Sequence, residues 1–131
     1  MGKLLFQRTE FRPGSEWTIG KDHLLRFNLN GNLEFWQTSR RRLIWETDTE
    51  GDRLTMQGDG NLVIYDGEVP VWSSGTFGNP DAVLAADEEG HLEILTSDLE
   101  FVLWQIEGEE PEESREDLAP EKEPAEIASE R

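Results

Sequence analysis

Three segments of the chain can be laid over one another, and this internal repeat constrains the fold more than any other feature. Each segment has Gly-(Asn or His)-Leu at the same place, beginning at Gly31, Gly60 and Gly90. The glycines follow one another at intervals of 29 and then 30 residues. A period of this length is typical of domains built from several copies of one small structural unit. The sequence therefore predicts a domain of three similar units.

Alternate positions within each repeat are apolar, which is the pattern of a strand with one buried face. The twelve positions of this parity are Leu25, Phe27, Leu33 and Phe35 in the first copy, Leu54, Met56, Leu62 and Ile64 in the second, and Leu84, Ala86, Leu92 and Ile94 in the third. The glycine of each copy follows Asn30, Asp59 or Glu89 and supplies a hairpin turn between two short strands.

Each repeat also ends in an apolar residue followed by tryptophan. The pairs are Ile44-Trp45, Val71-Trp72 and Leu103-Trp104. A three-fold repeat would bring these tryptophans together on a pseudo-three-fold axis. We therefore predict an all-β, closed, prism-like assembly around a tryptophan core, with about a dozen strands if each repeat holds roughly four strands of about 5 residues.

Charge divides the chain into a domain and a tail. The 131 residues carry a formal net charge of -17, and residues 107–131 hold 11 acidic and 3 basic side chains with almost no apolar ones. A segment of this composition cannot bury enough surface to offset its ordering entropy. The sequence predicts a folded domain over residues 1–106 and a disordered, acidic, Pro/Glu-rich tail over residues 107–131.

Composition also excludes several classes of protein. With no Cys, the chain has no disulfide framework, no Cys-type zinc site and no thiol nucleophile. The acidic excess argues against nucleic acid or an anionic membrane as the main partner. No secretory signal or membrane-spanning run is visible at the amino terminus. We therefore expect a cytoplasmic protein that does not insert into membranes, with non-classical export left open.

Polar side chains recur on the opposite face of the middle repeat. The residues of this parity are Gln57, Asp59, Asn61, Val63 and Tyr65. Their order resembles the Gln-x-Asp-x-Asn-x-Val-x-Tyr motif of the bulb-type (monocot, snowdrop-like) mannose-binding lectins. The segment from Phe11 to Trp17 and the segment from Trp72 to Thr76 are also similar to that family. The resemblance covers about residues 5–106.

The resemblance implies a β-prism type II fold and a metal-free, cofactor-free pocket for α-D-mannose. In the family, Asp and Asn bind the axial 2-hydroxyl, Gln binds O3, Tyr binds O4, and Val packs against the sugar. Carried over by motif position, these roles fall on Asp59, Asn61, Gln57, Tyr65 and Val63. Turn chemistry is the alternative explanation for the polar residues, but it accounts for Asp59-Gly60 and not for the whole alternation.

The other two copies depart from the motif. The five positions hold Asn28, Asn30, Asn32, Glu34 and Trp36 in the first repeat, and Asp87, Glu89, His91, Glu93 and Leu95 in the third. Glutamate replaces the apolar wall in both, and neither has the tyrosine hydroxyl. We expect one working site per chain and two degenerate ones. A metal cluster on the third face is disfavoured because it has a single His among solvated acids.

No catalytic constellation stands out. Only His23 and His91 are present, no serine lies in a nucleophile elbow, and no carboxylate pair is singled out for glycoside hydrolysis. We therefore predict a carbohydrate-binding lectin and not an enzyme. The alternative is a protein-protein interaction module that keeps the lectin fold and acts through its acidic tail or its degenerate faces.

Assembly is a further expectation. Members of the family commonly form homodimers by exchanging the C-terminal strand, and residues 101–106 are apolar enough to complete a neighbour's sheet. The basic run at residues 40–42 is read as a solvated loop, with docking of the acidic tail as the alternative.

Overall fold

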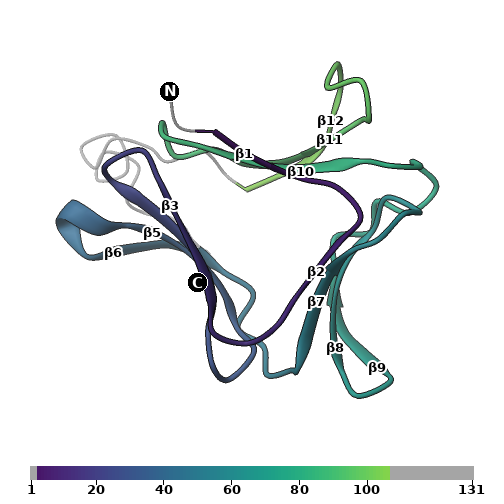
Figure 1. Cartoon of the computed structure of the whole chain (residues 1–131), viewed down its shortest axis with the longest axis horizontal. Coiled ribbons are helices and arrows are strands. Elements are labelled where there is room, and N and C mark those ends of the chain that lie inside the picture. Colours follow the sequence, from purple (N-terminus) through teal and green to yellow (C-terminus); the bar gives the residue numbers. More distant parts are fainter. Residues whose placement is uncertain (1–2, 107–131) are drawn as a thin grey trace, which may run out of the picture.

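Three four-stranded antiparallel sheets form the sides of a triangular prism in the computed structural model, which describes residues 3–106 (Figure 1). The sheets have the strand orders β1-β10-β11-β12, β2-β7-β8-β9 and β3-β4-β5-β6. The strands are β1 (Lys3–Phe6), β2 (Thr9–Phe11), β3 (Ser15–Ile19), β4 (His23–Phe27), β5 (Leu33–Gln37), β6 (Arg42–Glu46), β7 (Arg53–Met56), β8 (Leu62–Asp66), β9 (Val69–Ser73), β10 (Val83–Asp87), β11 (Leu92–Leu95) and β12 (Val102–Gln105), with a 3-10 turn at Thr38–Arg40. This is the predicted all-β, β-prism type II architecture of three repeats.

The predicted tail at residues 107–131 lies outside the described residues. Within residues 3–106, no helix is long and apolar enough to cross a membrane.

The N-terminal segment gives one strand to each sheet, which the repeat alone does not predict. Strands β1, β2 and β3 pair with β10, β7 and β4, respectively. The chain therefore runs along all three sides before the hairpin of the first repeat begins (Figure 1). Each repeat supplies three strands instead of the expected four, and residues 3–19 complete every sheet and tie the three together.

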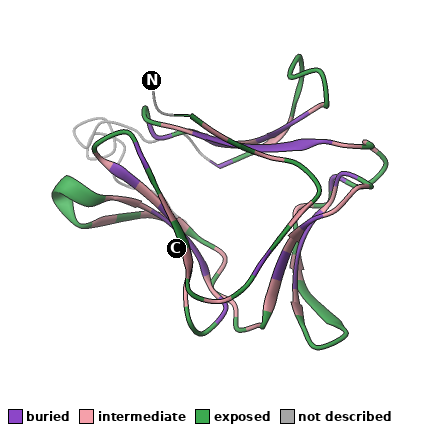
Figure 2. Ribbon diagram, in the orientation of Figure 1, coloured by how far each residue is buried: buried purple, intermediate pink, exposed green. Residues whose placement is uncertain are grey.

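The apolar face of the repeats fills the interior of the prism. All twelve positions of the predicted core parity are at most 2% exposed. Antiparallel pairing sets them opposite one another, as it does Leu54 with Ile64 and Met56 with Leu62. Full burial of one such side chain stabilises the fold by about 1.5–3 kcal/mol. Buried residues accordingly lie along the strands, whereas the hairpin ends are exposed (Figure 2).

Trp45, Trp72 and Trp104 meet on the axis, as the repeat predicts. Their ring centroids lie 5.4 to 5.9 Å apart with edge-to-face geometry. The three rings are half-buried and not fully buried. The reason is their position: β6, β9 and β12 are the last strands of their sheets, so no further strand covers them. Trp36 has the opposite parity from the core positions of its repeat and is also half-buried.

A second aromatic cluster closes the opposite edges of the sheets. Phe6, Phe11 and Trp17 come from β1, β2 and β3, and their ring centroids are 4.7 to 5.0 Å apart. The fold therefore has an aromatic cluster at each end of its core, one from the N-terminal segment and one from the ends of the repeats.

A β-bulge immediately precedes each of the three tryptophans, and at two of them its apolar residue packs against the core, whereas Val71 is 41% exposed. The register shifts opposite Ile44, Val71 and Leu103, immediately before each Trp. In a regular strand, adjacent side chains point to opposite faces, whereas a bulge places one extra residue and re-aims its neighbour. Ile44 and Leu103 consequently pack against the core together with the tryptophans.

Candidate functional site

The three repeats share one turn, which sets the geometry of each polar face. In the middle repeat, Gly60 N–H donates to Gln57 O (3.0 Å) and Gln57 N–H donates to Asn61 O (3.0 Å). The turn glycines have φ values of 93 to 94°, in the left-handed region. A Cβ on Gly60 would lie 2.1 Å from the carbonyl oxygen of Asn79. Glycine is therefore required here both by backbone conformation and by space.

The five motif residues of the middle repeat lie in and beside this turn, on the outer face of β7 and β8. Gln57 and Asp59 belong to the turn region, and Val63 and Tyr65 follow on β8. The Tyr65 hydroxyl donates to Gln57 Oε1 (2.7 Å), and Gln57 Nε2 donates to Asp59 Oδ1 (3.1 Å). Gln57 Nε2 also lies 3.3 Å from Asp59 Oδ2, and Asn61 N–H donates to Asp59 Oδ1 (3.0 Å). The three side chains therefore hold one another in place, and Asp59 as a residue is exposed to solvent.

Asn61 joins this face to the loop that follows β9. Its Oδ1 accepts hydrogen bonds from Ser74 Oγ (3.2 Å), Gly75 N–H (2.9 Å) and Thr76 N–H (3.1 Å). These bonds fix the side-chain amide, so Nδ2 is oriented as a donor. Among the described residues, Nδ2 has no hydrogen-bond partner of its own. Val63 is only 3% exposed. It therefore forms the apolar base of the middle face and does not project from it.

The middle face can therefore recognise a hydroxyl group. Asp59 contributes carboxylate acceptors, and Asn61 contributes a donor held by three bonds on its other end. A hydroxyl both donates and accepts, so this pair can engage it in one direction. All five predicted residues share this face of the sheet.

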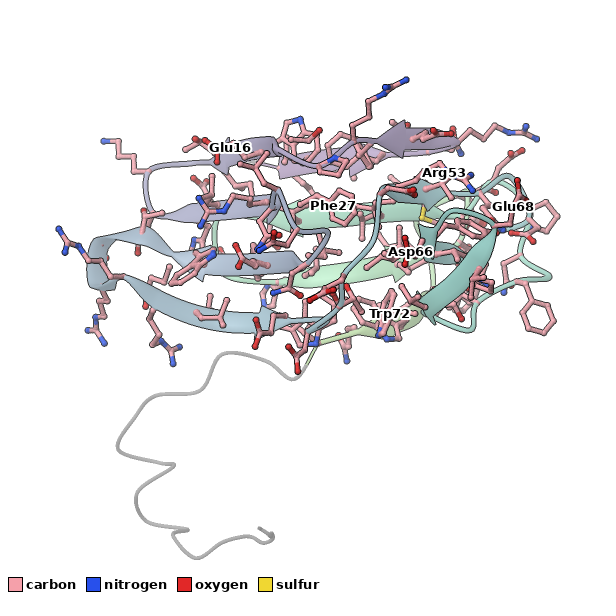
Figure 3. The ribbon with its side chains drawn as sticks, turned by 90° about the horizontal axis from the view of Figure 1, so that it is seen from below. Glu16, Phe27, Arg53, Asp66, Glu68 and Trp72 are labelled. Atoms are coloured by element: carbon pink, nitrogen blue, oxygen red, sulfur yellow. The ribbon has the colours of Figure 1, made fainter. Side chains whose placement is uncertain are left out.

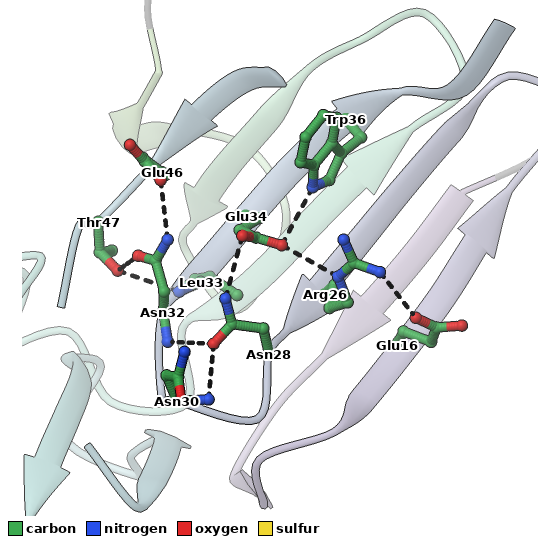
Figure 4. A network of polar contacts seen from close by, with 10 residues as sticks. All are labelled: Glu16, Arg26, Asn28, Asn30, Asn32, Leu33, Glu34, Trp36, Glu46 and Thr47. Carbon is green, nitrogen blue, oxygen red and sulfur yellow. Dashed lines mark hydrogen bonds and ion pairs between the residues drawn. The ribbon is translucent and has the colours of Figure 1, made fainter. Parts of the chain in front are cut away.

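The first repeat has the same turn but ties its polar groups to one another (Figure 4). Glu34, which occupies the position of Val63, is buried. It accepts hydrogen bonds from Arg26 Nε (3.0 Å), Asn28 Nδ2 (3.1 Å) and Trp36 Nε1 (3.1 Å). Asn32 Nδ2 donates to Glu46 Oε1 (2.8 Å). The donors that the middle face leaves available are thus engaged within the protein here.

The surroundings of Glu34 favour its charged form. Burial alone would raise its pKa, but the bonds from Trp36, Arg26 and Asn28 together outweigh burial, so the pKa of Glu34 lies below its ordinary value. The network therefore stabilises a carboxylate at the position where the motif has a methyl-bearing side chain.

The third repeat has an ion pair on its face. His91 Nδ1 lies 3.0 Å from Asp87 Oδ2. Leu95, in the tyrosine position, is 6% exposed and has no polar group. Within residues 3–106, no three His, Cys, Asp or Glu side chains are grouped so that they could hold a metal ion.

Two contributors to the middle face were missed by the sequence reasoning. The first is the Ser74-x-Thr76 pair, whose loop holds Asn61, and the first repeat uses Thr47 and Thr49 to hold Asn32 in the same way. This Ser/Thr-x-Thr pattern after the β-bulges of the first and middle repeats is a signal that could have been found. The second is Arg53, whose guanidinium carbon lies 4.2 Å from the centroid of the Tyr65 ring. The parity that groups the motif also places Arg53 on this face.

Solved structures with the same fold are lectins. A Marasmius oreades lectin superposes with a TM-score of 0.67 at 21% identity, covering 79% of this chain and 88% of that one. A monomeric monocot mannose-binding lectin from Gastrodia elata gives 0.66 at 23% identity, covering 80% and 96%. The snowdrop (Galanthus nivalis) mannose-specific agglutinin, solved with methyl-α-D-mannoside, gives 0.51 at 23% identity, covering 84% and 93%.

No protein-family model matches the sequence, and no curated protein matches it either. The structural neighbours are named as lectins and not as enzymes, in agreement with the expectation from the sequence. The three four-stranded antiparallel sheets match the architecture of these neighbours, and the chain has the fold of the bulb-type mannose-binding lectins.

Proposed function

We propose that this protein is a lectin that binds α-D-mannose or mannose-containing glycans on the middle-repeat face. The observation that carries the proposal is the pairing of Asp59 with Asn61. Asp59 is an exposed carboxylate, and Asn61 offers a donor fixed by the loop at residues 74–76. By motif position, this pair binds the axial 2-hydroxyl, Gln57 binds O3, Tyr65 binds O4, and Val63 packs against the sugar ring.

Selectivity follows from the fixed direction of these groups. An epimer with an equatorial 2-hydroxyl would leave the Asp59 and Asn61 groups without partners. Each unpaired polar group would then cost on the order of 1–3 kcal/mol. A single sugar in a shallow, solvated site should nevertheless bind weakly, with a Kd of about 1 mM, or about -4 kcal/mol.

Titration calorimetry with methyl α-mannoside tests the proposal. The expected result is one site per chain, with binding lost in Asp59→Asn because the exchange replaces one acceptor oxygen by a donor. Glu89→Gln is the matched control, since Glu89 occupies the same turn position in the third repeat, and it should bind normally. Equal binding of methyl α-galactoside, or normal binding by Asp59→Asn, would contradict the assignment. If no mannoside or mannan binds, the interaction-module alternative replaces the lectin proposal.

The proposed assembly is a homodimer formed by exchange of β12. In the single chain, β12 pairs with β11, yet Phe101 and Val102 are 62% and 49% exposed, so the segment has apolar surface for a second copy. The sequence of residues 107–131 adds a net charge of -8 to each chain, and its repulsion is screened by salt. Sedimentation should show a dimer that tightens at high salt or after truncation at Gly108. A monomer under all of these conditions would exclude exchange.

A further inference from the structure

A surface depression lies beyond Tyr65, at the far end of the middle face from the turn. It has a volume of about 510 Å³, and the residues that matter here are Glu10, Arg12, Asp52, Arg53, Gly67 and Glu68. They come from β2 and the residue after it, from β7 and the residue before it, and from the turn between β8 and β9. Arg53 and Glu68 are labelled at this end of the molecule in Figure 3. Its size is in the range of pockets that hold small ligands.

Arg53 belongs both to this depression and to the motif face. It pairs directly with Tyr65 in the register of β7 and β8, and its guanidinium lies over the Tyr65 ring at 4.2 Å. Tyr65 in turn donates to Gln57. A continuous row of contacts therefore joins the depression to the proposed mannose site.

The wall of the depression is held in place by the backbone of the β8–β9 turn. Gly67 N–H donates to Asp52 Oδ2 (3.1 Å), and Arg53 Nη2 donates to Gly67 O (3.3 Å). Asp52 N–H also donates to Tyr65 O (2.8 Å). These bonds fix the turn before any ligand arrives, which lowers the ordering cost of binding.

The remaining charged groups of the depression are available to a ligand. Among the described residues, no ion pair or hydrogen bond engages the side chain of Glu10, Arg12 or Glu68; the Ser15 hydroxyl donates to the Arg12 backbone carbonyl only. The first sheet differs, because there Arg26 pairs with both Glu34 (3.0 Å) and Glu16 (3.6 Å). Carboxylates accept hydrogen bonds and guanidinium groups donate them, so a mixed set suits a neutral molecule with many hydroxyls better than an anion.

The arginine and the complete motif occur together on one face of the three. The residue paired with Trp36 in the first sheet is Leu24. The residue paired with Leu95 in the third is Val83. Among the three sheets that the structure describes, only the middle one pairs an arginine directly across the strands with the motif's aromatic position. In the first sheet, Arg26 lies 5.9 Å from the Trp36 ring, but it is engaged by Glu34 and Glu16.

We propose that this depression is a second sugar subsite, which takes a neutral hexose linked to the mannose on the middle face. The inference rests on the proposed function and extends its ligand from a monosaccharide to a manno-oligosaccharide. Arg53 forms the shared wall, while Glu10 and Arg12 supply an acceptor and a donor for hydroxyls of the second sugar.

Calorimetry with methyl α-mannoside and with α1,2-, α1,3- and α1,6-linked methyl mannobiosides tests the subsite. At least one disaccharide should bind the full chain about tenfold more tightly than the monosaccharide, as expected for one or two added hydrogen bonds to charged groups. The double variant Glu10→Gln, Arg12→Gln should lose this increment and keep its affinity for methyl α-mannoside. Glu16→Gln, on the outer face of the first sheet, is the matched control and should keep both affinities.

The calorimetry distinguishes three negative results. If every disaccharide binds the wild type no better than the monosaccharide, the second subsite is excluded and the mannose site stands. If the increment exists but survives in the double variant, the depression is not its source and the inference is wrong. If neither ligand binds, both the proposed function and the subsite are overturned.

Discussion

The faces of the first and middle repeats share a turn and a register, but they use their polar groups differently. In the first, Glu34 gathers hydrogen bonds from Arg26, Asn28 and Trp36. In the middle repeat, Val63 occupies the position of Glu34 and Thr55 that of Arg26. Val63 has no polar group with which to accept such hydrogen bonds. The comparison teaches that one backbone can present polar groups to a ligand or satisfy them internally, depending on a single strand position.

The largest expected effect comes from moving the carboxylate to the middle face. In Val63→Glu, a carboxylate would take the place of a side chain that is only 3% exposed, with no arginine opposite. An unpaired buried charge of this kind should lower the free energy of unfolding by about 3–5 kcal/mol. Chemical denaturation measures the loss, and mannoside binding should disappear with it.

The matched rescue is Val63→Glu combined with Thr55→Arg. This pair recreates the cross-strand arrangement of Arg26 and Glu34, so a substantial part of the lost stability should return while mannoside binding stays absent. A double variant no more stable than Val63→Glu would show that the comparison of the two faces omits an essential partner.

The reverse exchange has a smaller expected effect. Glu34→Val removes the shared acceptor and leaves Arg26, Asn28 and Trp36 Nε1 without it, at a cost of about 1–3 kcal/mol in unfolding free energy. Because Arg26 can turn to solvent, adding Arg26→Thr should change stability little further. Denaturation curves of both variants measure this, and an unchanged midpoint in Glu34→Val would mean that the network contributes nothing.

Asn32 and Asn61 occupy equivalent positions in the two repeats, and replacing each by Asp should give a still smaller difference in stability. Asn32→Asp would bring a second carboxylate against Glu46 and should cost about 1 kcal/mol, as expected for an exposed charge contact. Ser73 occupies the position of Glu46 in the middle sheet, so Asn61→Asp keeps its loop acceptor with a smaller loss of stability. It should nonetheless lose mannoside binding, because the Nδ2 donor is gone. If Asn61→Asp still binds mannoside, the Asn61 Nδ2 donor is not needed for recognition of the sugar.

The smallest expected effect concerns pH on the third face. The hydrogen bond to Asp87 raises the pKa of His91 above its usual 6.5, against the effect of burial and with help from the charges of Asp87, Glu93 and Glu89. A raised folded pKa means that the stabilisation is complete below pH 6.5 and is lost as pH rises through the folded value. Thermal melts between pH 6 and 9 should show a slight decline that is absent in His91→Gln. An identical slope in both proteins would exclude this ion pair as its source.

The repeat and its parity predicted most of the fold, because the alternation of apolar residues directly indicates which face of each strand is buried. The axial tryptophans were also predictable from their spacing. The strands of residues 3–19 were not assigned to separate sheets, since that segment carries no copy of the repeat. The half-buried state of the tryptophans depends on which strands lie last in each sheet, which the repeat does not specify.

The candidate site was predictable as a list of residues but not as a set of contacts. The motif named the five residues, yet the support of Asn61 by the loop at residues 74–76 depends on a contact between two hairpins. The role of Glu34 likewise required its three partners to be placed around it. Arg53 lies outside the motif, and only the register between β7 and β8 brings it onto Tyr65.

The most direct test of the central claim uses Tyr65, the single tyrosine of the chain. Selective ring labelling of tyrosine gives NMR signals from the middle face alone. Titration with methyl α-mannoside should shift these signals progressively to saturation, and methyl α-galactoside at the same concentrations should leave them in place. Tyrosine signals that stay unmoved while calorimetry detects mannoside binding would place the sugar on another face and contradict the account.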